Sequence, residues 1–236
     1  MSSHKYLDFI KDEDLINHVE AVLQIAQSAF NHAEDELYSN TIDPFSAVFD
    51  VLRQGITLKA WLQQEKSRQI QKTLQNALGI FHQNLIGSIP GWSSLPVGNL
   101  IDVVNQKKQI IAEIKNKYNT TKGSDRKSIY DNLTSALKAE YKGFTGYYVE
   151  IIPSTLKPYD KPFTPSDNVT KRRRRPNKMI RVIDGKSFYS IATGKPNALR
   201  EIYYALPEVI SVILGGNASQ IKKDSLFEEL YSQAYA

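Results

Sequence analysis

The stretch IIAEIKNK, residues 110–117, restricts the fold of this chain more than any other segment. Side chains alternate between the two faces of a strand, so the apolar residues at 110, 112 and 114 share one face. Glu113 and Lys115 share the other face, roughly 6.5–7 Å apart. The pattern fits either an edge strand with a solvated charged face or a strand that joins a core and presents a carboxylate beside an amine. The flanking segments favour the second interpretation.

Those flanking segments predict a hairpin followed by a crossover. Residues 99–104 form another strand-like run, and the short turn after it contains QKK, so the pair is predicted to be an antiparallel hairpin. A helix is predicted over 124–143, with Ser124 as N-cap and Gly143 as C-cap. The run FTGYYVEIIP then predicts a strand that ends at Pro153. A strand, a helix and a strand in this order indicate a right-handed parallel crossover.

Ionisable residues of the hairpin form the pattern D-x10-E-x-K. Asp102 is predicted on the first strand, and Glu113 and Lys115 on the second. Carboxylates from neighbouring strands can converge on Mg²⁺, which prefers oxygen ligands and keeps several waters. The metal lowers the pKa of a bound water, and Lys115 could orient or deprotonate that water or stabilise negative charge. The hairpin therefore predicts a Mg²⁺ site for chemistry on a phosphate, with Asp102 and Glu113 as metal ligands.

The N-terminal part of the chain is predicted to be helical. Apolar residues repeat at helical spacing over 12–38, a short helix is expected to begin at Pro44, and a long helix covers 57–86. One sector of the long helix is polar, with Glu65, Gln69, Lys72 and Asn76. That sector is either solvated or faces a site. Glu65 is accordingly either a further catalytic acid near the metal or one half of a surface salt bridge.

A long irregular segment is predicted over 154–178, since prolines disfavour regular structure there. Long loops in compact domains are usually functional or disordered. The segment carries the basic run KRRRRPNK, which is either a solvated loop or a site that contacts phosphates and reads guanine edges. The candidates for contact with nucleic acid are Arg172, Arg173, Arg174, Arg175 and Lys178.

The stretch NKYNTTKGSD, residues 116–125, leaves the charged strand and enters the predicted helix. Helix N-termini suit phosphate binding. The stretch is therefore either a capped loop or a further contact to phosphates or bases. Its candidate residues are Asn119, Thr121, Lys122 and Ser124.

The C-terminal part, from MIRVIDGKSFYSIATG onward, predicts a strand and two helical pieces. Neither a repeat nor a clear linker divides the sequence, so we expect a single domain over 1–236. Its parts are a helical region (1–90), a hairpin, helix and strand with the charged residues (91–155), and a basic loop with C-terminal helices (156–236). The fold class is α/β (α+β), with a mixed central sheet, flanking helices and a helical N-terminal region.

Composition and charge exclude some classes of protein and permit others. The chain has 236 residues, enough for a core without a metal or disulfide staple, and no cysteine, which excludes disulfides and thiolate zinc sites. A net charge of +5 and a pI of about 9.1 permit a nucleic-acid partner. The N-terminus lacks the basic-then-apolar order of a signal peptide, and no apolar run approaches roughly 20 residues. We expect a cytoplasmic protein without a membrane partner.

The block IDVVNQKKQIIAEIKNKYNTTKGSD resembles the catalytic segment of PD-(D/E)XK nucleases, with ID in place of PD. Further blocks are DPFSAVFD, WLQQEKSRQIQKTLQNALGIFHQ, YYVEIIP, KPFTPSDN and IRVIDGKSFYSIATG. These blocks are similar to a bacterial family of type II restriction endonucleases that cut GGNCC-type sites. The similarity runs from about residue 5 to residue 212.

The resemblance implies a PD-(D/E)XK nuclease core and a Mg²⁺-dependent homodimer of the bacterial cytoplasm that cuts both strands of DNA at a GGNCC- or GGWCC-like site. The motif carries over onto Asp102, Glu113 and Lys115. A cognate DNA methyltransferase is implied as a functional, not physical, partner, and the N-terminal helices are the expected dimer surface. The alternatives are another PD-(D/E)XK enzyme, for repair or for junctions, and a catalytically inactive DNA-binding regulator. The intact charged triad argues against the regulator.

Overall fold

The computed structural model of the chain describes residues 4–33, 37–38, 42–96, 98–121, 123–167 and 169–235, except the side chain of Ser219. The chain divides into two compact units. One is Glu20–Leu78, and the other combines Met1–Val19 with Gly79–Ala236. The expected single domain, with parts at 1–90, 91–155 and 156–236, stays a prediction.

The unit Glu20–Leu78 is helical. Its elements are the greater part of α1 (Asp12–Asn31), all of α2 (Pro44–Gln54) and α3 (Leu58–Gly87) as far as Leu78. The side chain of Asp43 accepts a 2.9 Å hydrogen bond from the Phe45 N–H and so begins α2, while Gly55 ends it at a φ of 65°. The predicted helices are confirmed, but α1 ends at Asn31 instead of residue 38.

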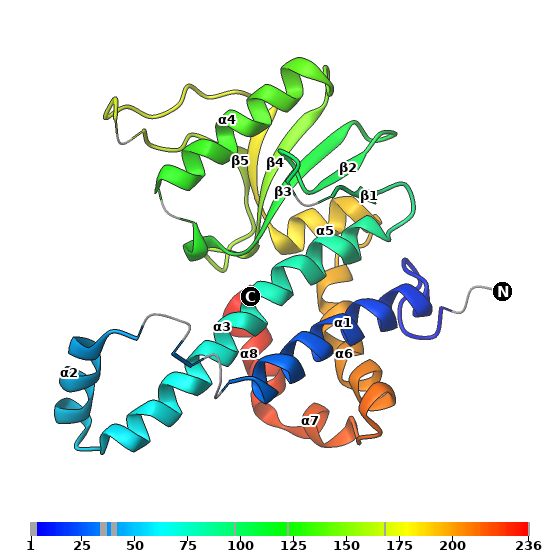
Figure 1. The fold of residues 1–236 in the computed structure, drawn as a ribbon. Helices are drawn as coiled ribbons and strands as arrows, with labels where there is room; N and C mark the ends of the chain where they lie inside the picture. The colour runs from blue at the N-terminus through cyan, green and yellow to red at the C-terminus, as the bar shows by residue number, and fades with distance from the viewer. Residues whose placement is uncertain are drawn as a thin grey trace. The chain divides into compact units, whose positions relative to one another are not determined.

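A six-stranded mixed sheet forms the centre of the other unit (Figure 1). Its strands are β1 (Ser93–Ser94), β2 (Val103–Asn105), β3 (Ile110–Lys117), β4 (Thr145–Ile152), β5 (Asp160–Pro162) and β6 (Ile180–Asp184). They lie in the order β1-β2-β3-β4-β6-β5. β3, β4 and β6 are parallel, and the other neighbouring strands are antiparallel. The predicted hairpin, the parallel crossover and the mixed α/β class are confirmed.

Helix α4 (Gly123–Ala139) covers one face of this sheet. Its residues Ile129 and Leu133 pack in a buried cluster with Ile111 of β3 and Tyr148 of β4. Because side chains alternate along a strand, Glu113 emerges on the same face as Ile111. The charged side chains of β3 therefore lie on the face that α4 covers.

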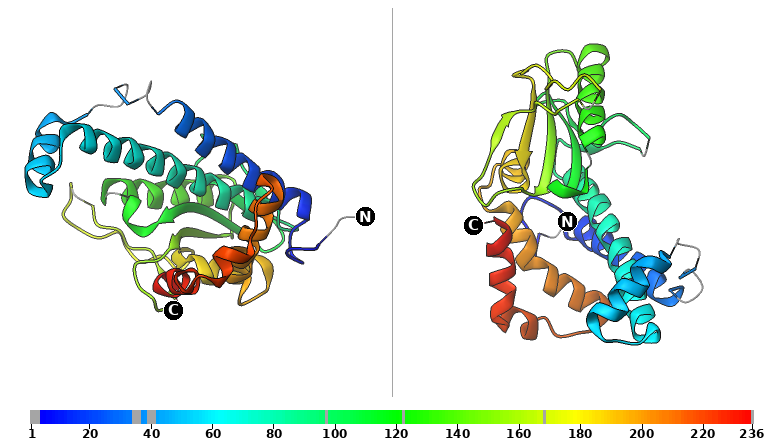
Figure 2. Two further views of the ribbon diagram at one scale, coloured as in Figure 1. Left: turned by 90° about the horizontal axis from the view of Figure 1, so that it is seen from below. Right: turned by 90° about the vertical axis from the view of Figure 1, so that its left-hand side faces the viewer.

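Helix α5 (Gly185–Thr193) packs on the opposite face of the sheet (Figure 2). Asp184 begins α5 by accepting a 2.8 Å hydrogen bond from the Ser187 N–H. The ring of Phe188 then lies 5.8 Å from that of Tyr147, which alternates with Tyr148 on β4. Gly185 is required here, because a Cβ atom would collide with the backbone of Ile151.

Helix α6 (Ala198–Leu214) follows, as predicted. The sequence patterns did not predict the 3-10 turn η1 (Tyr118–Thr120), the short strand β5, or the helices α7 (Ser219–Lys223) and α8 (Ser225–Tyr235). β5 was hidden by Pro162, which is tolerated because β5 is an edge strand. In the part of the chain that the structure describes, no helix is long and apolar enough to cross a membrane.

Several predicted boundaries were wrong by a few residues. Asp102 precedes β2 instead of lying within it. α4 begins at Gly123, so Ser124 lies in the first turn and is not the N-cap. The helix ends at Ala139, and Gly143, with a φ of 84°, belongs to the turn that leads to β4.

Candidate active site

Asp102 is fixed against β3 by two hydrogen bonds. Its backbone N–H donates to the carbonyl of Ala112 at 2.9 Å, which extends the hairpin by one residue. Its carboxylate oxygen Oδ2 accepts a hydrogen bond from the Ile114 N–H at 2.6 Å. The side chain of Asp102 therefore lies beside Glu113 on the neighbouring strand, although Asp102 is outside β2.

Glu113 and Lys115 form an ion pair along β3. The Lys115 ammonium lies 2.7 Å from Oε1 of Glu113. The side chain of Glu113 is 15% exposed and that of Lys115 is 37% exposed, so the lysine is the more accessible partner. The structure thus brings together the three residues of the predicted D-x10-E-x-K pattern.

The electrostatics of this cluster show an excess of buried negative charge. Burial raises the pKa of Asp102, although the Ile114 N–H and the charge of Lys115 act against the increase. Burial and the nearby charge of Asp102 raise the pKa of Glu113. Burial alone would lower the pKa of Lys115, but the charges of Glu113 and Asp102 outweigh it and raise that pKa. A cation beside the carboxylates would relieve their desolvation and mutual repulsion.

This donor set fits a hard divalent cation held mainly by water. Among the described residues, no group of three or more His, Asp or Glu side chains could hold a metal, so an all-protein cage is absent there. Asp102 and Glu113 supply a pair of carboxylates instead. One or two carboxylates plus several waters and substrate phosphate oxygens are a common Mg²⁺ environment.

Gln83 of α3 supports this site and was not predicted from the sequence. Its side-chain amide donates to the carbonyl oxygens of Leu95 and Asp102, at 3.1 and 3.3 Å. These carbonyls belong to the segment that leads into β2, so the amide fixes the backbone that carries Asp102. A glutamine on a helix has no sequence signal that would distinguish this role.

A second ionic cluster lies beside Lys115 and also escaped prediction. Glu150 of β4 is 2% exposed and pairs in register with Lys115. Its carboxylate accepts a 2.6 Å hydrogen bond from Arg126 of α4 and another from the Tyr159 hydroxyl. The only signal in the sequence was an isolated glutamate within the apolar run YYVEII.

The basic run is partly built into the fold. Arg174 lies 2.8 Å from Asp131 of α4 and 3.8 Å from the buried Asp167, which fastens the loop to α4. The loop is further held by the Tyr130 hydroxyl, which donates to the carbonyl of Arg175 at 3.1 Å. Arg172, Arg173, Arg175 and Lys178 are exposed. Contact of these side chains and of Arg174 with DNA stays a prediction.

The stretch after β3 is only partly engaged with the core. The Thr121 hydroxyl accepts a 3.1 Å hydrogen bond from the Tyr148 hydroxyl, and Asn119 is exposed in η1. The Ser124 hydroxyl donates to Asp125 at 3.2 Å in the first turn of α4. Lys122 lies outside the described residues. Contact of Asn119, Thr121, Lys122 and Ser124 with DNA stays a prediction.

Glu65 belongs to the helical unit Glu20–Leu78. Both of its carboxylate oxygens accept hydrogen bonds from Arg68, at 2.5 and 2.6 Å, and Gln69 adds a 3.0 Å bond. The hydrogen bond from Arg68 is the main cause of its lowered pKa. This is the salt bridge expected as one alternative, and a catalytic role of Glu65 stays a prediction.

Comparison with known proteins identifies the family. A protein-family model described as Eco47II restriction endonuclease matches residues 7–215. The chain is 41% identical over 218 residues to the type II restriction enzyme Eco47II of Escherichia coli, covering 91% of this chain and 90% of that protein. It is 33% identical over 241 residues to the type II restriction enzyme Sau96I of Staphylococcus aureus, covering 99% of this chain and 91% of that protein. No solved structure matches the chain. The chain belongs to the Eco47II restriction endonuclease family and is a type II restriction endonuclease.

Proposed function

We propose that this enzyme hydrolyses phosphodiester bonds of double-stranded DNA at a GGNCC- or GGWCC-like site, in a Mg²⁺-dependent reaction centred on Asp102, Glu113 and Lys115. The observation that carries the proposal is the convergence of these side chains at the β2–β3 hairpin, with a 2.7 Å contact between Glu113 and Lys115. The sheet supports assignment to the PD-(D/E)XK nucleases, because a hairpin, a covering helix and a parallel strand follow one another around this site.

In this proposal, Asp102 and Glu113 would hold Mg²⁺, and Asp102 is the better oriented because the Ile114 N–H fixes its carboxylate. When bound, the metal would supply an acidified water and neutralise charge on the phosphate. The ammonium of Lys115 lies 2.7 Å from Oε1 of Glu113, beside these two carboxylates. Lys115 would orient the attacking water and stabilise negative charge on the phosphate.

We also propose that the enzyme acts as a homodimer, because a near-palindromic site is cut in both strands most simply by two protomers related by a two-fold axis. Helix α2 supplies a candidate surface for this contact. Its apolar residues Phe45, Val48, Phe49 and Leu52 lie on one face at helical spacing and are 54–78% exposed. Exposed apolar patches of this kind mark protein–protein contacts.

A DNA methyltransferase of the same recognition site would protect the host genome.

Digestion of a plasmid that carries a single GGNCC site tests this function. With Mg²⁺, the wild type is expected to convert the plasmid to one linear product. With EDTA in place of Mg²⁺, the plasmid should stay supercoiled. A smear of fragments, or cleavage at junctions and mismatches alone, would contradict the proposed site-specific activity.

A further inference from the structure

A cavity of about 350 Å³ lies beside the N-terminal turn of α4. Its other walls are β5 with the residues that follow as far as Ser166, Val182 of β6, and Arg173 of the basic run KRRRRPNK. Phe163 and Val182 supply apolar parts of its wall, and Arg126, Lys161 and Arg173 supply its cations. Among the described residues that line it, none is acidic. The cavity therefore concentrates positive charge around an open space.

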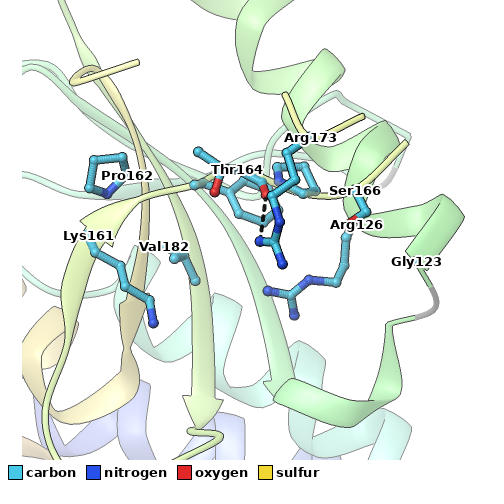
Figure 3. Close-up of a pocket in the computed structure, with 10 residues that line it drawn as sticks. Gly123, Arg126, Lys161, Pro162, Thr164, Ser166, Arg173 and Val182 are labelled. Carbon is cyan, nitrogen blue, oxygen red and sulfur yellow. Dashed lines mark hydrogen bonds between the residues drawn. The ribbon is translucent and has the colours of Figure 1, made fainter. Parts of the chain in front are cut away.

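Two of the cations, Arg126 and Arg173, come together from different elements, and Lys161 lies on the other side of Val182 (Figure 3). The guanidinium groups of Arg126 and Arg173 point toward each other, although one comes from α4 and the other from the basic loop. The guanidinium of Arg173 donates a 3.4 Å hydrogen bond to the carbonyl of Thr164, and the Lys161 ammonium lies 5.0 Å from the Tyr159 ring. In the described part of the chain, neither Arg173 nor Lys161 has a carboxylate partner. Such an arrangement of like charges is stabilised by an anion.

Arg126 is rigidly held at the wall of the cavity. One of its nitrogens, Nη1, lies 2.6 Å from the buried carboxylate of Glu150. Its guanidinium also lies 5.1 Å from the ring of Tyr148 and 5.5 Å from that of Phe163. Stacking and ion pairing fix the side chain, so little further entropy is lost when an anion binds.

The cavity opens on the same face of the sheet as the candidate active site. Glu113 of β3 pairs in register with Tyr148 of β4, which pairs with Val182 of β6. Residues paired in register emerge on the same face, and neighbouring strands are about 4.8 Å apart. The wall at Val182 is therefore roughly 10 Å from Glu113 across the sheet.

We propose that this cavity binds one phosphate group of the DNA backbone, with Arg126, Lys161 and Arg173 as its ligands, and thereby positions the strand on the active site. The proposal rests on DNA being the substrate. A phosphate fits better than a base edge, because three cations line one cavity, whereas the edge of a guanine offers only the acceptors O6 and N7 to a single arginine or lysine. The site adds Arg126 and Lys161 to the predicted DNA-contacting residues and gives Arg173 a defined role.

The salt dependence of binding tests this assignment. Binding of cognate and non-cognate 20-base-pair duplexes is measured with Ca²⁺ in place of Mg²⁺ over a series of salt concentrations. Arg173→Ala and Lys161→Ala are expected to weaken binding to both duplexes about tenfold. The slope of log K against log salt should become less negative by up to about 0.9, the value for one phosphate contact. Lys142→Ala removes the same charge beyond the far end of α4 and should leave the slope unchanged.

A methylphosphonate scan locates the contact. Neutralising individual phosphates of the cognate duplex should weaken wild-type binding at one position in each half-site. With that phosphate neutralised, Arg173→Ala should bind no more weakly than it binds the unmodified duplex. Arg173→Lys should still lose most of the affinity that the wild type loses. If Arg173→Ala weakens binding to the cognate duplex alone, Arg173 reads a base. If the salt slopes of Arg173→Ala and Lys161→Ala equal that of the wild type, the two side chains are solvated and contact no phosphate. Either result overturns the phosphate site. Because binding is measured without cleavage, a failure of the proposed cleavage reaction would appear separately, in the plasmid digestion with Mg²⁺.

Discussion

Lys115 of β3 and Glu150 of β4 are register partners on adjacent parallel strands, yet their side chains form different ion pairs. Glu150 binds Arg126 and Tyr159, whereas Lys115 binds Glu113. The buried carboxylate next to the lysine is thus neutralised from α4. Lys115 consequently remains directed at the predicted metal ligand.

Replacing this lysine should stop the chemistry without preventing DNA binding. Lys115→Ala removes the cation that orients water and stabilises charge, so the single-turnover cleavage rate should fall by about 100-fold or more. The affinity for the cognate duplex with Ca²⁺ should change little. Lys107→Ala, in the turn of the same hairpin, removes an equal charge and should cleave at the wild-type rate. A Lys115→Ala enzyme that cuts as fast as this control would exclude Lys115 from the reaction.

Gln83 is expected to act as a positioning residue. Gln83→Leu keeps the approximate volume but removes the donor to the Leu95 and Asp102 carbonyls. The Mg²⁺ concentration for half-maximal cleavage should rise about 10-fold, since supporting hydrogen bonds contribute 10–100-fold to metal affinity. Saturating Mg²⁺ should restore much of the rate. A rate defect that is independent of Mg²⁺ would point to a general loss of structure.

His82 should make the folded state sensitive to acid. Its ring nitrogen lies 2.9 Å from the Tyr189 hydroxyl, and burial lowers the pKa of His82 to about 4. The folded state then binds fewer protons than the unfolded state between pH 6.5 and 4, so stability falls as the pH decreases through this range, by at most about 3 kcal/mol.

Urea unfolding at pH 7 and pH 5 measures this effect. His82→Gln removes the titration and should reduce the difference in unfolding free energy between the two pH values. His32→Gln is the matched control, because His32 is exposed, and it should keep the wild-type difference. Equal pH dependence in His82→Gln and the wild type would show that His82 is not responsible.

The exposed face of α2 predicts the effect of a charge on assembly. Phe49 is 77% exposed and central to this face, so Phe49→Glu should raise the dimer dissociation constant more than tenfold. Sedimentation equilibrium should then show monomers where the wild type is dimeric. Gln54→Glu adds the same charge to the same helix, away from the apolar face, and should remain dimeric. A dimeric Phe49→Glu enzyme would place the interface elsewhere.

The local patterns of the sequence predicted the hairpin, the crossover and the main helices, because apolar periodicity reports which face of an element is buried. Asp102, Glu113 and Lys115 could be grouped for the same reason, since a hairpin brings them together within a short stretch of chain. The exact boundaries were less predictable. Asp102 lies outside β2, yet its hydrogen bond to Ile114 places the carboxylate where a strand residue would have placed it.

Long-range contacts could not be predicted in this way. Arg126 and Glu150 are far apart in the chain and meet only because α4 packs across β4. The pairing of Arg174 with Asp131 likewise depends on how the basic loop folds back along α4. A run of arginines indicates affinity for phosphate but does not show which of its members the fold itself uses.

The most direct test compares cleavage and binding by Glu113→Ala. Cleavage of a duplex with one GGNCC site is measured with Mg²⁺ under single-turnover conditions, and binding of the same duplex is measured in EDTA, without a divalent cation. The account predicts no detectable cleavage by Glu113→Ala, with a dissociation constant for DNA equal to or below that of the wild type, because a carboxylate that repels phosphate has been removed. Cleavage by Glu113→Ala at the wild-type rate would contradict the assignment of Asp102, Glu113 and Lys115 as the active site.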